Sequence, residues 1–147
     1  MSIMVNMTNV WVVAVLLFAT VLQAPQTVDE TFERLAKVEI FAFGPVGYAG
    51  TTSAGEKDYK AILSRPMALV DCERLYSSGN AMAKADALVG NRNFNPERFI
   101  ALAQPMRNSK ERITTMHGCI VSHESLGAIV DQIESGRYSR QQESTPE

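Results

Sequence analysis

The distribution of charge along the chain constrains its fold more than any other feature. The first ionisable side chain among 147 residues is Asp29, and residues 10–22 form an uncharged run that is apolar except for Thr20. The small residue Ala24 and then Pro25 follow this run. An apolar stretch at the extreme N-terminus followed by a small residue is typical of a secretory signal. We therefore predict that residues 1–24 are a targeting segment and lie outside the folded domain.

The fate of this segment stays open at the level of the sequence. Residues 1–9 contain no Lys or Arg, and Leu22 is large for its position two residues before Ala24, so cleavage after Ala24 is not assured. If uncleaved, residues 3–22 are just long enough to cross a hydrocarbon core. A buried N-terminal helix of a cytosolic domain is the third interpretation. We expect an exported protein, periplasmic or secreted, which residues 3–22 tether to the membrane if they are retained.

The remaining chain has the size and charge of one ordinary domain. Residues 25–138 are predicted to form a single helical domain, and residues 139–147 a disordered polar tail. All 14 basic and 16 acidic side chains follow residue 28, with the two signs interspersed and a formal net charge of −2. This balance does not support a nucleic-acid surface, and it leaves the N-terminal segment as the one route to a membrane.

Capping signals divide this domain into short helices. Thr27 and Glu30, and again Ser53 and Glu56, have the spacing of a capping box. Residues 66–90 are predicted to form a helical hairpin broken before Asn80, and further helices are expected after Asn95-Pro96 and after Ser122. Residues 44–55 contain four glycines and one proline, which predicts a loop.

One stretch has the period of a strand. Residues 111–122 place β-branched side chains on both sides of Met116-His117-Gly118, which predicts a β-hairpin, with an irregular loop as the alternative. The predicted class is therefore mainly α: short helices and helical hairpins with one possible β-hairpin near residues 111–122. Residues 66–90 resemble a unit of HEAT-like solenoids, but no repeat of fixed period recurs, so the chain is assigned to no family.

The candidate chemistry of highest specificity lies in the same stretch. His117, Cys119 and His123 occupy alternate positions, which on one extended strand would face the same side. Two imidazoles and a thiolate could then bind zinc or act as a Cys/His nucleophilic pair. The alternative is a surface hairpin with a turn histidine, a histidine near a helix start and a structural cysteine.

The two cysteines, Cys72 and Cys119, allow two interpretations. In an oxidising compartment they could form one disulfide, and otherwise they are two unrelated thiols.

No complete catalytic or cofactor motif occurs. Residues 50–57 approach the spacing of a phosphate-binding loop, but Glu56 stands where the lysine is required. We therefore expect a non-catalytic binding or structural module that needs no cofactor and has a protein as its possible partner. The glycine-rich loop is the candidate binding site, with residues Tyr48, Gly50, Thr51 and Thr52. The alternative function is a metal- or thiol-dependent enzyme that uses His117, Cys119 and His123.

Aromatic residues flank this loop. Phe41, Phe43 and Tyr59 could line a pocket together with Tyr48, or they could belong to the core.

Overall fold

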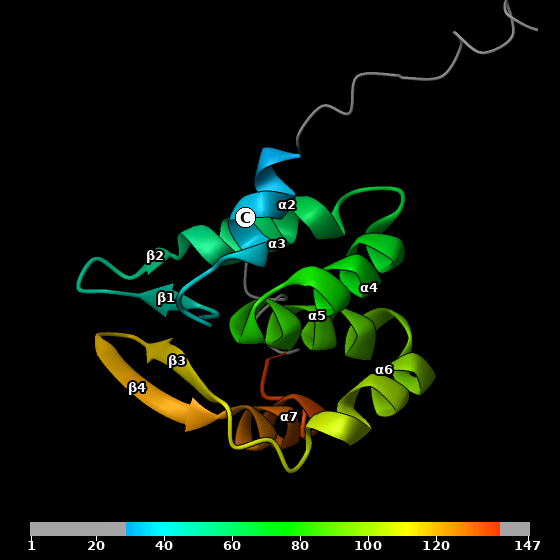
Figure 1. The fold of residues 1–147 in the computed structure, drawn as a ribbon. Coiled ribbons are helices and arrows are strands. Elements are labelled where there is room, and N and C mark those ends of the chain that lie inside the picture. The colour runs from blue at the N-terminus through cyan, green and yellow to red at the C-terminus, as the bar shows by residue number, and fades with distance from the viewer. Residues whose placement is uncertain (1–28, 139–147) are drawn as a thin grey trace, which may run out of the picture.

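The computed structural model describes residues 29–138, so the predicted targeting segment and polar tail lie outside it. Within this range the chain forms six α-helices and two short antiparallel β-hairpins (Figure 1). The predicted mainly helical class with a hairpin is confirmed. None of the helices between residues 29 and 138 is long and apolar enough to span a bilayer.

The elements follow one another along the chain with short connections. They are α2 (Glu30–Ala36), β1 (Pro45–Val46), β2 (Thr51–Thr52), α3 (Ala54–Leu63), α4 (Ala68–Ser78), α5 (Ala81–Phe94), α6 (Pro96–Ala103), the 3-10 turn η1 (Gln104–Met106), β3 (Arg112–His117), β4 (Ile120–Ser125) and α7 (Leu126–Glu134).

Three of the predicted helix starts are confirmed by their caps. The Ser53 hydroxyl accepts the Glu56 amide at 3.0 Å, and the Asn80 side chain accepts the Ala83 amide at 2.9 Å. Asn95 caps α6, with Pro96 at the first helical position. These side chains satisfy amides that have no partner within the helix.

Two other helix starts differ from the prediction. The Asp29 carboxylate, not Thr27, caps α2 by accepting the Phe32 amide at 3.1 Å. Ser125, not Ser122, caps α7, because the chain stays extended for three more residues as part of β4. The β-hairpin is therefore longer than the predicted residues 111–122.

Helix α5 is the centre of the helical layer and lies between α4 and α7 (Figure 1). Its Ala83, Ala85 and Ala87 side chains are fully buried, and their small size allows neighbouring helices to approach closely. Gly90 is required for the same reason. A Cβ at this position would lie 2.6 Å from the Cys72 Sγ on α4.

The strands β3 and β4 form the predicted hairpin. They pair from Arg112↔Ser125 to His117↔Ile120, which leaves Gly118 and Cys119 as a two-residue turn. Gly118 has a φ of +56°, in the left-handed region that glycine adopts without strain.

A second hairpin occupies the stretch predicted as a loop. Strands β1 and β2 pair Pro45 with Thr52 and Val46 with Thr51. Gly47 and Gly50 lie between them with φ values of +71° and +61°. The prediction of a loop was wrong here, because the glycines form the tight turn that lets two very short strands meet.

The segment between α2 and β1 joins the two hairpins. The Phe41 amide donates to the Thr114 carbonyl at 2.8 Å, and the Met116 amide donates to the Phe41 carbonyl at 3.2 Å. Further along, the Gly47 amide donates to the Gly118 carbonyl at 2.8 Å. These contacts are parallel bridges, so β3 lies between β4 and the segment that contains Phe41.

Candidate functional site

The side of β3 and β4 that faces away from the helices is apolar near the turn and polar farther from it, where Thr114 lies opposite His123. Met116 lies directly opposite Val121 on this side. Ile40 and Ala42 flank Phe41, whose side chain points into the core, so they point to the same side as Met116. We call this surface the outer face and define it by Ile40, Met116 and Val121, with the buried Ala42 beneath it.

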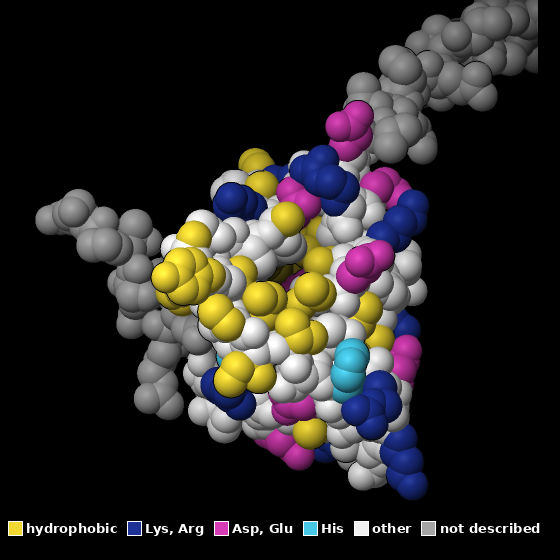
Figure 2. Space-filling view, turned by 90° about the vertical axis from the view of Figure 1, so that its left-hand side faces the viewer, with side chains coloured by type: hydrophobic (Ala, Val, Ile, Leu, Met, Phe, Trp, Pro, Cys, Tyr) yellow, Lys and Arg dark blue, Asp and Glu magenta, His cyan; other side chains and the backbone are white. Residues whose placement is uncertain are grey.

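A cleft of about 250 Å³ opens at one edge of the outer face. It is lined by Val38, Glu39, Ile40, Ala42, Ser53, Ala54, Gly55 and Met116. Figure 2 shows the side of the molecule that carries the hairpins, where hydrophobic side chains gather around a hollow. Val121 keeps 53% of its surface exposed, so the apolar area continues past the cleft onto β4. A contiguous exposed apolar area of this kind often marks a contact with another molecule.

Strand β4 has an open edge. Among residues 29–138 it pairs only with β3, whose other side is covered by the Phe41 segment. In an antiparallel pair, successive residues direct their backbone N–H and C=O groups alternately toward and away from the partner strand. The backbone groups of Val121 and His123 point away from β3. The Arg112 guanidinium donates to the His123 carbonyl at 3.3 Å. The Val121 amide and carbonyl remain as a backbone donor and acceptor for an added strand.

Positive charge lies at the end of this edge farthest from the turn. Lys110 and Arg112 are exposed, and within the described part of the chain neither forms an ion pair. Three other surface arginines do have carboxylate partners: Arg34 pairs with Asp58, Arg98 with Glu73 and Arg107 with Glu134. The open edge therefore combines an apolar end with a basic end.

A hydrogen-bonded chain of side chains fixes the hairpin on α7. The Thr115 hydroxyl donates to Glu124 at 3.1 Å, and the Gln132 amide donates to the other Glu124 oxygen at 2.6 Å. The Tyr138 hydroxyl then donates to Gln132 at 2.8 Å, and burial raises the pKa of Tyr138 to about 12. Glu124 and Gln132 could not be identified from the sequence, because their spacing across a strand and a helix matches no motif.

The structure does not bring His117, Cys119 and His123 together. The chain reverses at Gly118 and Cys119, so His117 points inward and His123 points outward beside Thr114. The His117 ring stacks on Tyr138 at 6.4 Å, and burial together with nearby Arg137 lowers the pKa of His117. Within residues 29–138 no group of three or more potential ligands is arranged to hold a metal ion. The prediction of a shared face was wrong because it treated the turn as extended strand.

The two cysteines are free thiols, which corrects the candidate disulfide. Cys72 is buried on α4 beneath α5, where desolvation raises its pKa to about 12. Cys119 is exposed in the β3–β4 turn.

This arrangement predicts the reactivity of the two thiols. In the native protein we expect a thiol reagent to modify Cys119 quickly and to leave Cys72 unmodified, since only an accessible thiolate reacts. In denaturant, without a reductant, both should react. Titration with a chromogenic disulfide reagent counts the reactive thiols in the native and in the denatured protein. The Cys119→Ser variant should show no fast reaction. A count of zero in denaturant would restore the disulfide.

The candidate residues of the glycine-rich loop lie on the β1–β2 hairpin. Tyr48 is fully exposed at its turn, Gly50 supplies a left-handed position, and Thr51 and Thr52 form β2. The Gly47–Gly118 hydrogen bond places this turn beside the β3–β4 turn. The β1–β2 hairpin joins the sheet on the side of β3 opposite β4, so these residues lie across β3 from the open edge, and they do not line the cleft.

The other aromatic residues of the predicted pocket belong to the core. Phe41, Phe43 and Tyr59 are at most 3% exposed. Phe43 packs edge to face against both Phe41 and Tyr59, with ring centroids 5.2 Å apart in each pair. Of the four aromatic residues considered, only Tyr48 is available to a partner.

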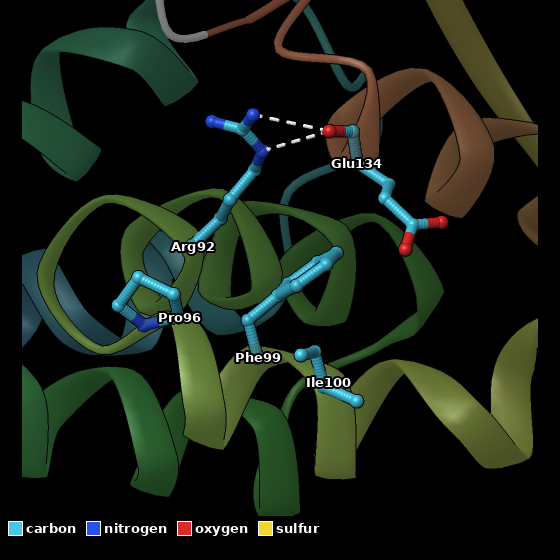
Figure 3. Close-up of a pocket in the computed structure, with 5 residues that line it drawn as sticks. All are labelled: Arg92, Pro96, Phe99, Ile100 and Glu134. Atoms are coloured by element: carbon cyan, nitrogen blue, oxygen red, sulfur yellow. Dashed lines mark hydrogen bonds between the residues drawn. The ribbon is translucent and has the colours of Figure 1, made fainter.

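A second cleft, of about 260 Å³, is lined by Arg92, Pro96, Phe99, Ile100 and Glu134 (Figure 3). Its charged groups serve the fold. The Arg92 guanidinium donates to the Glu134 carbonyl at 3.0 and 3.2 Å, which satisfies the C-terminal end of α7. The Glu134 carboxylate binds Arg107 at 2.7 Å. Neither charge is directed at a ligand, so the outer face is the stronger candidate.

Comparison of the chain with protein-family models, with curated proteins and with solved structures gives no match.

Proposed function

We propose that this protein is an exported, non-catalytic binding module that residues 3–22 tether to the membrane, and that it holds an extended segment of a partner protein against β4. The observation that carries this proposal is the open edge of β4 beside the apolar outer face. The uncharged N-terminal segment supports export, and residues 3–22 are long enough to serve as the tether.

An open edge next to an apolar surface suits strand addition. An added strand would take its affinity from main-chain hydrogen bonds to Val121 and its neighbours, and its specificity from alternate side chains. One set of these side chains would lie on the outer face beside Val121, with Met116 one strand further in. Burial of apolar surface there contributes roughly 25 cal/mol per Å².

The charges indicate the chemistry of the partner. Lys110 and Arg112 lack carboxylate partners within the part of the chain that the structure describes, and they lie at one end of the edge. An extended segment with apolar residues at alternate positions and Asp or Glu at one end complements both parts of the surface.

A proline substitution tests strand addition directly. Val121→Pro removes an amide that points away from β3, and proline is tolerated on an edge strand with this orientation. The probe is a fluorescent ten-residue peptide of alternating valine and threonine that ends in two glutamates. We expect Val121→Pro to weaken its binding to the full chain by about tenfold or more, because one hydrogen bond is lost and the edge is blocked. Fluorescence anisotropy measures the affinity.

The matched control is Val121→Thr, which keeps both the amide and a β-branched side chain. Its affinity should stay within about threefold of the wild type, since only one methyl group is exchanged for a hydroxyl. Circular dichroism should show the same helical content in both variants. Equal peptide binding by Val121→Pro, or no binding by the wild type at millimolar peptide, would overturn the proposal.

A further inference from the structure

The first turn of α4 exposes apolar side chains that the core does not use. Met67 and Val70 keep 60% and 55% of their surface exposed, and the neighbouring Pro66 and Leu69 are exposed as well. We call this surface the α4 corner and define it by Pro66, Met67, Leu69 and Val70. These residues follow one another at a helix start, so they form one small apolar area.

The apolar character of the outward side of α4 ends after its first turn. Glu73, Arg74 and Ser77 are the exposed residues of the following turns, while Cys72 and Leu75 supply the buried side. Helix packing alone would accept polar residues at the α4 corner too, since its side chains contribute little to the core. The local change from polar to apolar therefore requires another explanation.

The α4 corner lies where the N-terminal segment enters the domain. The Arg65 guanidinium, next in sequence to this corner, binds the Asp29 carboxylate at 2.9 Å and is 3.5 Å from Asp71. Asp29 is separated from Leu22 by six residues, which span at most about 25 Å when fully extended. If residues 3–22 cross a bilayer, the α4 corner is held within reach of its surface.

We infer that the α4 corner inserts into the interfacial region of a lipid bilayer. The inference rests in part on the proposed tether, and it adds a second, peripheral contact that orients the domain. Arg65 is compensated by Asp29 and Asp71, so the contact relies on apolar insertion and requires no anionic lipid. The β3–β4 hairpin lies at the opposite end of the domain from the α3–α4 connection (Figure 1). This orientation leaves the edge of β4 open to a partner.

Fluorescence quenching by brominated lipid tests the contact in the full chain. The chain is reconstituted in phosphatidylcholine vesicles with Cys119→Ser and Val70→Cys, and the new thiol carries a bimane label. Interfacial apolar residues lie about 5 to 10 Å below the headgroups, so we expect lipid brominated near the headgroup to reduce this fluorescence about twofold. The matched control is Ile120→Cys in the same Cys119→Ser background, an exposed position at the other end of the domain, and its label should not be quenched.

Flotation of the same vesicles separates this inference from the proposed tether. If the chain floats with the vesicles but the label at position 70 is not quenched, the inference is overturned and the tether stands. If the chain does not float, both fail, while peptide binding at β4 is still measured independently. A label at position 70 that is shielded from aqueous iodide yet insensitive to brominated lipid would show that protein covers the α4 corner, either residues 3–22 or a second copy of the chain. This result also overturns the inference.

Discussion

The Phe41→Ala substitution is expected to lower the free energy of unfolding by about 3 to 5 kcal/mol, the usual cost of deleting a buried phenyl ring. Phe41 is 1% exposed and packs edge to face against Phe43 and Tyr138, at centroid distances of 5.2 and 4.9 Å. Its backbone also pairs with β3. The cavity would therefore form beneath the surface that carries the candidate site.

Urea unfolding followed by circular dichroism measures this loss. Tyr48→Ala is the matched control, because it removes an aromatic ring of similar size from a fully exposed position seven residues away. Its stability should stay within about 0.5 kcal/mol of the wild type, as for most surface substitutions. If Phe41→Ala were as stable as Tyr48→Ala, the packing of Phe41 against Phe43 and Tyr138 would not stabilise the domain.

Local signals in the sequence predicted most of the helices. A capping side chain and the amide that it satisfies lie within three residues of each other, so Ser53, Asn80 and Asn95 could be identified without knowledge of the fold. The contact between Phe41 and Thr115 joins residues 74 positions apart. No local pattern encodes such a pairing, and for this reason the attachment of the Phe41 segment to the predicted hairpin could not itself be predicted.

The position of one turn explains why the predicted site of His117, Cys119 and His123 does not form. Alternate residues share a face only while the strand continues, and the reversal at Gly118 and Cys119 places His117 and His123 on opposite sides. The β1–β2 hairpin was missed for a related reason. Its strands have two residues each, which is too short for any periodicity to be recognised.

Asp86 is the buried ionisable residue with the largest expected effect on stability. It lies on α5 and is 4% exposed, and among the described residues no cation forms an ion pair with it. Desolvation raises the pKa of Asp86 well above its usual range, and the Glu56 carboxylate raises it further. Glu56 itself is held by the Gly44 amide and by Lys60, both at 2.8 Å. The protonated form of Asp86 is therefore the one that the fold favours.

The raised pKa fixes the direction of the pH dependence. In the unfolded chain Asp86 ionises near pH 4, whereas in the folded domain it keeps its proton to higher pH. Unfolding above about pH 4 therefore releases a proton, and stability falls as the pH rises from there toward the folded pKa. The contribution of Asp86 is fully present only below about pH 4. Other carboxylates with lowered pKa values, such as Asp29 at about 2, act in the opposite direction only in more acidic solution.

The Asp86→Asn variant isolates this contribution, because the amide has nearly the same shape and cannot ionise. At pH 8 we expect it to be more stable than the wild type by at least about 1 kcal/mol, which raises Tm by about 4 to 8 °C in a domain of this size. Near pH 4 the difference should disappear, since both side chains are then neutral. Asp131→Asn is the control, because its carboxylate is exposed, and its Tm should stay close to that of the wild type at each of the two pH values. A Tm difference between Asp86→Asn and wild type that is independent of pH would show that Asp86 is ionised in the native protein.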